Sequence, residues 1–236
     1  MAGYKLTEMF LDESAKGRPG KKIHPKGLVV HWTANTGRGA NARANRNYFN
    51  HTDRSVSAHY VVDDKEVVQC LPEDEMAYHV GAKTYKEKAV HELSGYPNDC
   101  TIGIEICVNA DGDFKKTLKN VIALAADICK RYGWCRENLW RHYDITGKDC
   151  PRFFVDEETA VLYTLSSAGG AWDRFKVDVE MAKLGEKKVT WKDEIMQKAV
   201  EKGFIDEGKH NPNDPAPKWF VLEVLMDALE KKEGRP

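Results

Sequence analysis

The sequence has no long apolar run. None of its 236 residues lie in an uninterrupted apolar segment close to the roughly 20 residues that a membrane-spanning helix needs. Glu8 and Asp12 interrupt the apolar residues around Phe10, and no basic segment precedes them as in a secretory signal peptide. We therefore expect no membrane insertion, no signal peptide and a protein that stays in the cytoplasm in which it is made.

An excess of charge is missing too. The 36 basic and 37 acidic residues give a formal net charge of −1. Such a balance provides no bulk attraction to nucleic acid or to an anionic membrane, so we expect neither as a partner. The hydrophobic fraction of 42% is enough to bury a core, and the length allows one ordinary domain plus a small second one.

The cysteines lack the spacing of a disulfide framework. A chain of this length can fold without such crosslinks, and an unpaired cysteine behaves as a small apolar residue. We expect buried free thiols at most of the six positions, with Cys150 set apart by the residues around it. The cysteines are Cys70, Cys100, Cys107, Cys129, Cys135 and Cys150.

Short apolar segments alternate with helical patterns along the first three quarters of the chain. In Thr101–Val108 the isoleucines alternate with Gly103, Glu105 and Cys107, which predicts a strand with Glu105 on the face opposite the isoleucines. The other expected strands are Leu28–Trp32, the hairpin Ser57–Val62 and Glu66–Leu71, and Leu139–His142. The alternation predicts an α/β fold with a mixed central sheet flanked by helices.

The predicted helices follow the spacing of one buried face. We expect Tyr48 and Phe49 to point inward from the first of them, and Gly169-Gly170 to separate the last two. The helices are about Ala42–Asn50, Thr117–Tyr132, Glu157–Leu165 and Ala171–Leu184. A charged hinge near Gly185–Val189 then separates a first domain, 1–185, from a small helical C-terminal module, 187–236.

Three residues have the chemistry of a metal site. His31 ends a buried strand, and His142 and Cys150 flank a turn at Gly147. Two imidazoles and a thiolate suit zinc, and three protein ligands leave a fourth position for water, as in catalytic sites. The alternatives are a structural histidine at His31 and an ordinary loop with an incidental cysteine at Cys150.

Five motifs in a fixed order identify a family. They are His31-Trp32-Thr33-Ala34, Ser57-Ala58-His59-Tyr60-Val61-Val62-Asp63, Ala77-Tyr78-His79-Val80-Gly81, Ile102-Gly103-Ile104-Glu105, and His142-Tyr143-Asp144 with Gly147-Lys148-Asp149-Cys150-Pro151. Over about residues 20–184 the chain resembles type 2 N-acetylmuramoyl-L-alanine amidases, whose fold is shared with T7-type lysozyme and peptidoglycan recognition proteins. It is most similar to the amidases of phage and prophage of Gram-positive bacteria.

The resemblance implies zinc (Zn²⁺) ligands at His31, His142 and Cys150, a catalytic carboxylate at Glu105 and a positive charge at Lys148. In this interpretation Glu105 takes a proton from water, and Lys148 stabilises the oxyanion. T7-type lysozymes have a tyrosine where Ala58 stands and lack the glutamate, so a tyrosine-based mechanism is disfavoured. The alternatives are a carboxylate paired with a base at Glu105 and a solvated loop lysine at Lys148.

His59 and His79 match family positions that line the cleft. We expect them to bind substrate or to orient the metal ligands, and simple core packing is the alternative. The remaining histidines, His24, His51, His91 and His210, have no motif partner and are expected at the surface.

The function implied by the resemblance is that of an endolysin. Such an enzyme cuts the amide bond between N-acetylmuramic acid and L-alanine in peptidoglycan, and waits in the host cytoplasm until a separate pore-forming protein releases it. The C-terminal module is expected to bind the cell wall; alternatively it packs on the first domain or on another copy. A bacterial autolysin, a non-catalytic peptidoglycan-binding protein and a protein with structural zinc are the rival interpretations. The last would need a fourth protein ligand.

Overall fold

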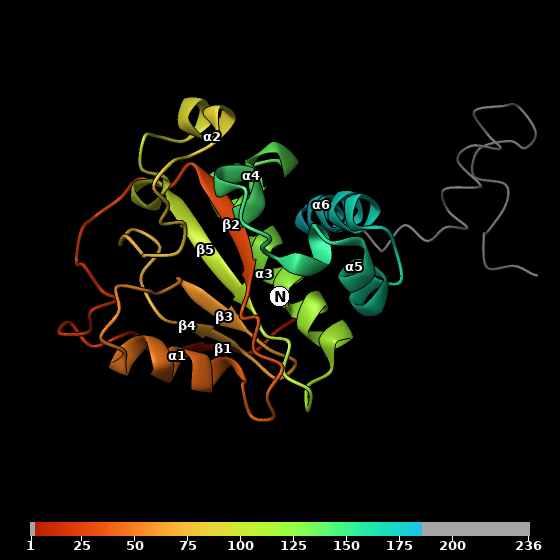
Figure 1. Cartoon of the computed structure of the whole chain (residues 1–236), viewed down its shortest axis with the longest axis horizontal. Coiled ribbons are helices and arrows are strands. Elements are labelled where there is room, and N and C mark those ends of the chain that lie inside the picture. Colours follow the sequence, from red (N-terminus) through yellow and green to blue (C-terminus); the bar gives the residue numbers. More distant parts are fainter. Residues whose placement is uncertain (1–2, 186–236) are drawn as a thin grey trace, which may run out of the picture. The chain divides into compact units, whose positions relative to one another are not determined.

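The fold is built around a mixed six-stranded sheet (Figure 1). The computed structural model describes residues 3–185. In spatial order β1-β4-β3-β5-β2-β6, only β3 and β4 are antiparallel neighbours. The strands are β1 (Leu6–Glu8), β2 (Gly27–Trp32), β3 (Tyr60–Val62), β4 (Val67–Gln69), β5 (Thr101–Ile106) and β6 (Leu139–Arg141). The predicted mixed α/β fold is confirmed.

The hairpin of β3 and β4 is shorter than predicted, and β1 was not predicted at all. β1 has three residues, of which Leu6 and Glu8 are exposed, so it shows no apolar pattern. It is held as an edge strand by parallel pairing with β4, in the register Leu6 with Val67. Backbone pairing of this kind leaves no signal in the sequence.

Helices cover both faces of the sheet. They are α1 (Ala42–His51), α2 (Glu87–Glu92), α3 (Phe114–Tyr132), α4 (His142–Thr146), α5 (Glu157–Thr164) and α6 (Ala168–Leu184), with short 3₁₀ helices η1 (Pro97–Asp99), η2 (Arg136–Asn138) and η3 (Arg152–Phe154). α3 begins a turn earlier than predicted because the Asp113 side chain accepts a hydrogen bond from the Lys116 N–H. It ends, as predicted, at Tyr132, and the next residue, Gly133, has a positive φ that terminates the helix.

Three local predictions were wrong. Tyr48 points outward and is half exposed, whereas its neighbour Phe49 is buried. His142 is the first residue of α4 and not the last of a strand, because Asp144 accepts the Arg141 N–H and starts a helical turn. Gly169 and Gly170 lie inside α6, since the Ser167 hydroxyl caps the Gly170 N–H.

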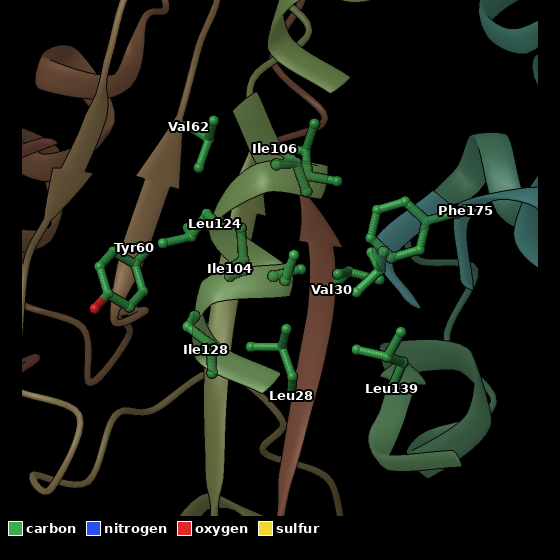
Figure 2. Packing of buried hydrophobic residues seen from close by; sticks show 14 of the residues in the cluster. Leu28, Val30, Tyr60, Val62, Ile104, Ile106, Leu124, Ile128, Leu139 and Phe175 are labelled. Carbon is green, nitrogen blue, oxygen red and sulfur yellow. The ribbon is translucent and has the colours of Figure 1, made fainter. Parts of the chain in front are cut away.

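One face of the sheet packs against α3 and α6 and forms the main core (Figure 2). Its side chains come from alternate strand positions, as the period of two requires. They include Leu28 and Val30 of β2 and Ile104 and Ile106 of β5, which pack with Leu124 and Ile128 of α3 and Phe175 of α6. All of these side chains are nearly or completely buried.

The opposite face carries two smaller apolar clusters. One joins Phe49 of α1 to Val61 and Val68, and the other joins Val29 to Trp140 and Ile145 beside α2 and α4. His31, His59, His79 and His142 are buried on this face. The sequence pattern that builds the core on one face therefore places polar groups on the other.

The remaining predictions about the chain can be stated briefly. All six cysteines are free, and all but Cys135 are buried. Within residues 3–185, each helix is too short or too polar to cross a bilayer. The predicted C-terminal module, 187–236, lies outside the described residues.

Candidate metal centre and active site

The strand register explains how the proposed ligands meet. His31 of β2 lies beside Glu105 of β5 in the parallel ladder, so both side chains point to the same face. β6 is the other neighbour of β2 and ends at Arg141, opposite Val30. His142 follows directly, at the level of His31, and starts α4.

The segment after α4 turns back and brings Cys150 to the same place. The turn after α4 passes through Gly147, which has a φ of 83°. The Tyr143 N–H then donates to the carbonyl of Cys150 at 2.9 Å, which fixes the cysteine against the start of α4. Three separate segments thus bring His31, His142 and Cys150 together, as the sequence predicted.

The three donor atoms have the separation that one metal ion requires. The two Nδ1 atoms of His31 and His142 are 3.1 Å apart, and Cys150 Sγ is 3.7 Å from His31 Nδ1. All three donors lie within 4.8 Å of one another. In a tetrahedral zinc site the bond lengths imply roughly 3.3 Å between two nitrogens and roughly 3.6 Å between a nitrogen and a sulfur. The residues therefore fit zinc.

The electrostatics agree with this fit. Burial lowers the pKa of His31 well below its ordinary value, and His142 and His79 lower it further. Burial and the charge of Lys148 lower the pKa of His142 to about 4. Both imidazoles are therefore neutral near pH 7, which is the form that binds a metal. Burial raises the pKa of the Cys150 thiol to about 12, so its thiolate needs a cation beside it.

Glu105 is the carboxylate next to the three donors. Its side chain is partly exposed, but its Oε2 is buried and has no hydrogen-bond partner among residues 3–185. Burial raises the pKa of Glu105 to about 8, and the positive charge of Lys148 opposes this rise. A buried carboxylate oxygen without a partner is costly to keep, so it marks a position with a task beyond folding.

Lys148 belongs to the exposed turn between Gly147 and Cys150. Its charge lowers the pKa of both His142 and Glu105, so it acts on the site without being buried in it. This position at the exposed edge of the site allows the ammonium of Lys148 to attract negative charge on a bound substrate.

His79 lies behind His31 and does not face the donors. Its Nδ1 is 2.9 Å from His31 Nε2, and its Nε2 is 3.2 Å from the Thr101 hydroxyl and 3.3 Å from the Thr101 carbonyl. The ring is buried, with 7% of the residue exposed. This position corresponds to the expected role of orienting a ligand; substrate contact by His79 stays a prediction.

His59 is fully buried, and both of its ring nitrogens contact the backbone. Its Nδ1 accepts the Gly103 N–H at 2.9 Å, and its Nε2 donates to the Glu75 carbonyl at 2.8 Å. Since both nitrogens are engaged, the geometry assigns His59 to joining β5 and the segment before α2. Substrate binding by His59 stays a prediction.

Three residues near the site had no predicted role. The Thr33 hydroxyl is buried and has no hydrogen-bond partner within the described part of the chain. Thr101 holds the ring of His79, and Gly103 leaves room for it: a Cβ at Gly103 would approach the His79 ring to 2.7 Å. All three lie in or beside the quoted motifs, which were the one available signal. The contacts of Thr101 and Gly103 with His79 join separate segments of the chain.

Comparison with known proteins gives a consistent result. The profile of the N-acetylmuramoyl-L-alanine amidase family matches residues 20–153. A probable N-acetylmuramoyl-L-alanine amidase of Bacillus licheniformis is 40% identical over 157 residues, which are 64% of this chain and 43% of the relative. The N-acetylmuramoyl-L-alanine amidase XlyA of Bacillus subtilis (strain 168) is 35% identical over 174 residues, 74% of this chain and 50% of XlyA. The chain thus spans about half the length of these curated relatives.

The fold comparison extends the likeness to a solved structure. A mutant endolysin from Bacillus subtilis superimposes with a TM-score of 0.59 and 34% sequence identity. The match covers 75% of this chain and 99% of the endolysin chain. The match therefore includes almost all of that solved chain.

Proposed function

Since the chain belongs to the N-acetylmuramoyl-L-alanine amidase family, we propose that it is a zinc-dependent hydrolase of peptidoglycan. The bond it cleaves is the amide between the lactyl group of N-acetylmuramic acid and L-alanine. The observation that supports this most directly is the convergence of His31 Nδ1, His142 Nδ1 and Cys150 Sγ within 4.8 Å. Beside them lies Oε2 of Glu105, which has no hydrogen-bond partner among residues 3–185.

His31, His142 and Cys150 are the residues that would hold the ion. When bound, zinc supplies Lewis acidity, which polarises the scissile carbonyl and lowers the pKa of water. The protein's part is to present two neutral imidazoles and one thiol at suitable separations in a buried place. Three protein ligands leave one side of the site for substrate and water.

Glu105 is the proton carrier in this proposal. Its carboxylate accepts a proton from the attacking water and then donates it to the nitrogen of the leaving L-alanine. A group with a pKa of about 8 can both accept and donate a proton near neutral pH, so Glu105 is suited to both steps. The ammonium of Lys148 at the edge of the site stabilises the negative charge that develops on the carbonyl oxygen.

The wider role proposed for the whole protein is that of an endolysin. The similarity to a Bacillus subtilis endolysin, which covers 75% of this chain and 99% of that chain, supports this role. The proposal includes peptidoglycan as the partner, a cell-wall-binding role for the module 187–236, and residence in the host cytoplasm before release.

The test uses purified Gram-positive cell walls and the full chain. We expect new N-terminal alanine to appear with the untreated protein, to be absent after treatment with a chelator, and to return when zinc is added. The chelator should act on the protein, so chelator-treated walls washed free of chelator serve as the control.

Release of reducing sugar ends in place of N-terminal alanine would overturn the assigned bond. Binding to the walls with no new amine, with or without zinc, would indicate a non-catalytic recognition protein of the same fold.

A further inference from the structure

We infer that His79 is a positioning residue, which with Thr101 selects the ring form of His31 that leaves Nδ1 free to bind a metal. The inference rests on the proposed zinc site and adds to it a residue that touches neither metal nor substrate. It follows from a series of connected hydrogen bonds on the buried side of His31.

This series of hydrogen bonds starts at Thr101, the first residue of β5. Its hydroxyl lies 2.6 Å from the Pro97 carbonyl, which can only accept, so the hydroxyl hydrogen is donated there. The Thr101 hydroxyl oxygen and the Thr101 carbonyl can then only accept from His79. His79 Nε2 therefore carries the hydrogen, and in the neutral ring His79 Nδ1 is a bare acceptor.

The same rule sets the form of His31. His79 Nδ1 lies 2.9 Å from His31 Nε2, so His31 must donate from Nε2. A neutral His31 then has an unprotonated Nδ1, which is the atom that faces His142 and Cys150. The protein thus presents a metal-binding nitrogen before any metal arrives, and donation from Nε2 raises the basicity of the ring.

The position of the His79 ring is fixed from two sides. The backbone N–H groups of His79 and Val80 both donate to Asn98 Oδ1, at 3.1 and 2.9 Å, and Asn98 is 1% exposed. On the other side Gly103 leaves the space that the ring fills, since a Cβ there would lie 2.7 Å from it. A side chain at Gly103 would displace the ring and with it the acceptor of His31.

His59 provides an internal control. Its ring centroid is 5.8 Å from that of His79, and it is buried as deeply. Its nitrogens, however, contact the Gly103 N–H and the Glu75 carbonyl, and not His31. Replacement of either imidazole removes a buried ring, but only replacement of His79 removes the partner of His31.

The experiment compares zinc affinity in metal-free proteins by competition with a fluorescent chelator. His79→Phe keeps a ring and removes the acceptor, so we expect zinc to bind about 10–100-fold more weakly. His79→Asn retains an acceptor near the place of Nδ1 and should recover part of the loss. His59→Phe is the matched control and should keep zinc affinity within about twofold, whatever it does to thermal stability. Unchanged affinity in His79→Phe, or an equal loss in His59→Phe, would overturn the inference.

A second measurement uses the unmutated protein, in case a variant does not fold. Long-range ¹H–¹⁵N spectra of the metal-free protein should show hydrogen on Nε2 of both His31 and His79. Hydrogen on Nδ1 of either ring would overturn the inference. This readout also separates the two proposals: unmutated protein with the expected ring forms but without zinc binding would refute the proposed function alone.

Discussion

The two faces of the central sheet are built from the same strands but have different roles, one in stability and the other in chemistry. Toward α3 and α6, β2 and β5 present Val30, Ile104 and similar side chains to a dry core (Figure 2). Toward the other side, the intervening residues His31 and Glu105 lie between two apolar clusters. Alternation with a period of two therefore lets a six-residue strand contribute to stability and to chemistry at once.

The difference also concerns what makes each face stable. The core face gains free energy from burial of apolar area, which tolerates small changes of shape. The histidine face instead depends on each buried polar atom finding a partner, as in the contacts of Thr101, His79 and His31. Changes on the first face should affect folding, and changes to His31 or to its contacts on the second face should affect metal binding and activity.

The largest effect should come from Cys150→Ser. Removal of the thiolate takes away one of three proposed zinc ligands, so we expect amidase activity on cell walls to fall by at least about 1,000-fold, or about 4 kcal/mol. Cys100→Ser, which also replaces a buried thiol but lies in the cluster around Val29, is the matched control. Full activity in Cys150→Ser would remove that residue from the site.

Glu105→Gln should separate catalysis from metal binding. The amide keeps the shape of the side chain but cannot carry the proton, so the rate of hydrolysis should fall about 100–10,000-fold. Zinc content, measured on the same samples, should stay at the level of the unmutated protein. If zinc is lost together with activity, Glu105 belongs to the metal site and not to proton transfer.

Ile104→Ala tests the core face. Loss of a fully buried side chain should lower the free energy of unfolding by about 2–5 kcal/mol in denaturant titrations. The zinc affinity of the folded protein should remain the same, which is the opposite of the expectation for His79→Phe. Leu162→Ala, at a position that is 76% exposed, should change stability by no more than about 0.5 kcal/mol.

The last prediction concerns the pH dependence of stability and His59. Burial lowers the pKa of His59 to about 4 from the ordinary 6.5, so the unfolded chain binds a proton here that the folded protein excludes. Its contribution to stability is complete above pH 6.5 and is lost as the pH falls toward 4, by about 1.4 kcal/mol per unit. His59→Asn should therefore flatten the decline in unfolding free energy over this range. An identical slope in both proteins would show that His59 does not titrate on unfolding.

Much of this division could be predicted from the sequence. The isoleucines of β5 identified the core face, and the parity of the strand placed Glu105 opposite to it. The motifs placed His31, His142 and Cys150 in one site, and the structure brings these three together. The strand features are readable because they depend on local periodicity. The set of three ligands followed from the resemblance of the ordered motifs to a family.

The features that could not be predicted depend on individual side-chain contacts, two of them local and one across the fold. The helical start at His142 depends on the side chain of Asp144, and the inclusion of Gly169 in α6 depends on the cap at Ser167. The contact between His79 and His31 joins residues 48 positions apart on separate segments. No periodicity marks a buried imidazole as the partner of another, so its role appears only when both rings are in place.

The central claim is that one zinc ion is held by His31, His142 and Cys150, and anomalous diffraction at the zinc edge from crystals of the zinc-loaded protein tests it most directly. The account predicts a single peak at about 2.0–2.1 Å from both Nδ1 atoms and about 2.3 Å from Cys150 Sγ, with no fourth protein ligand. A peak with four protein ligands, or no peak at these residues, would contradict it.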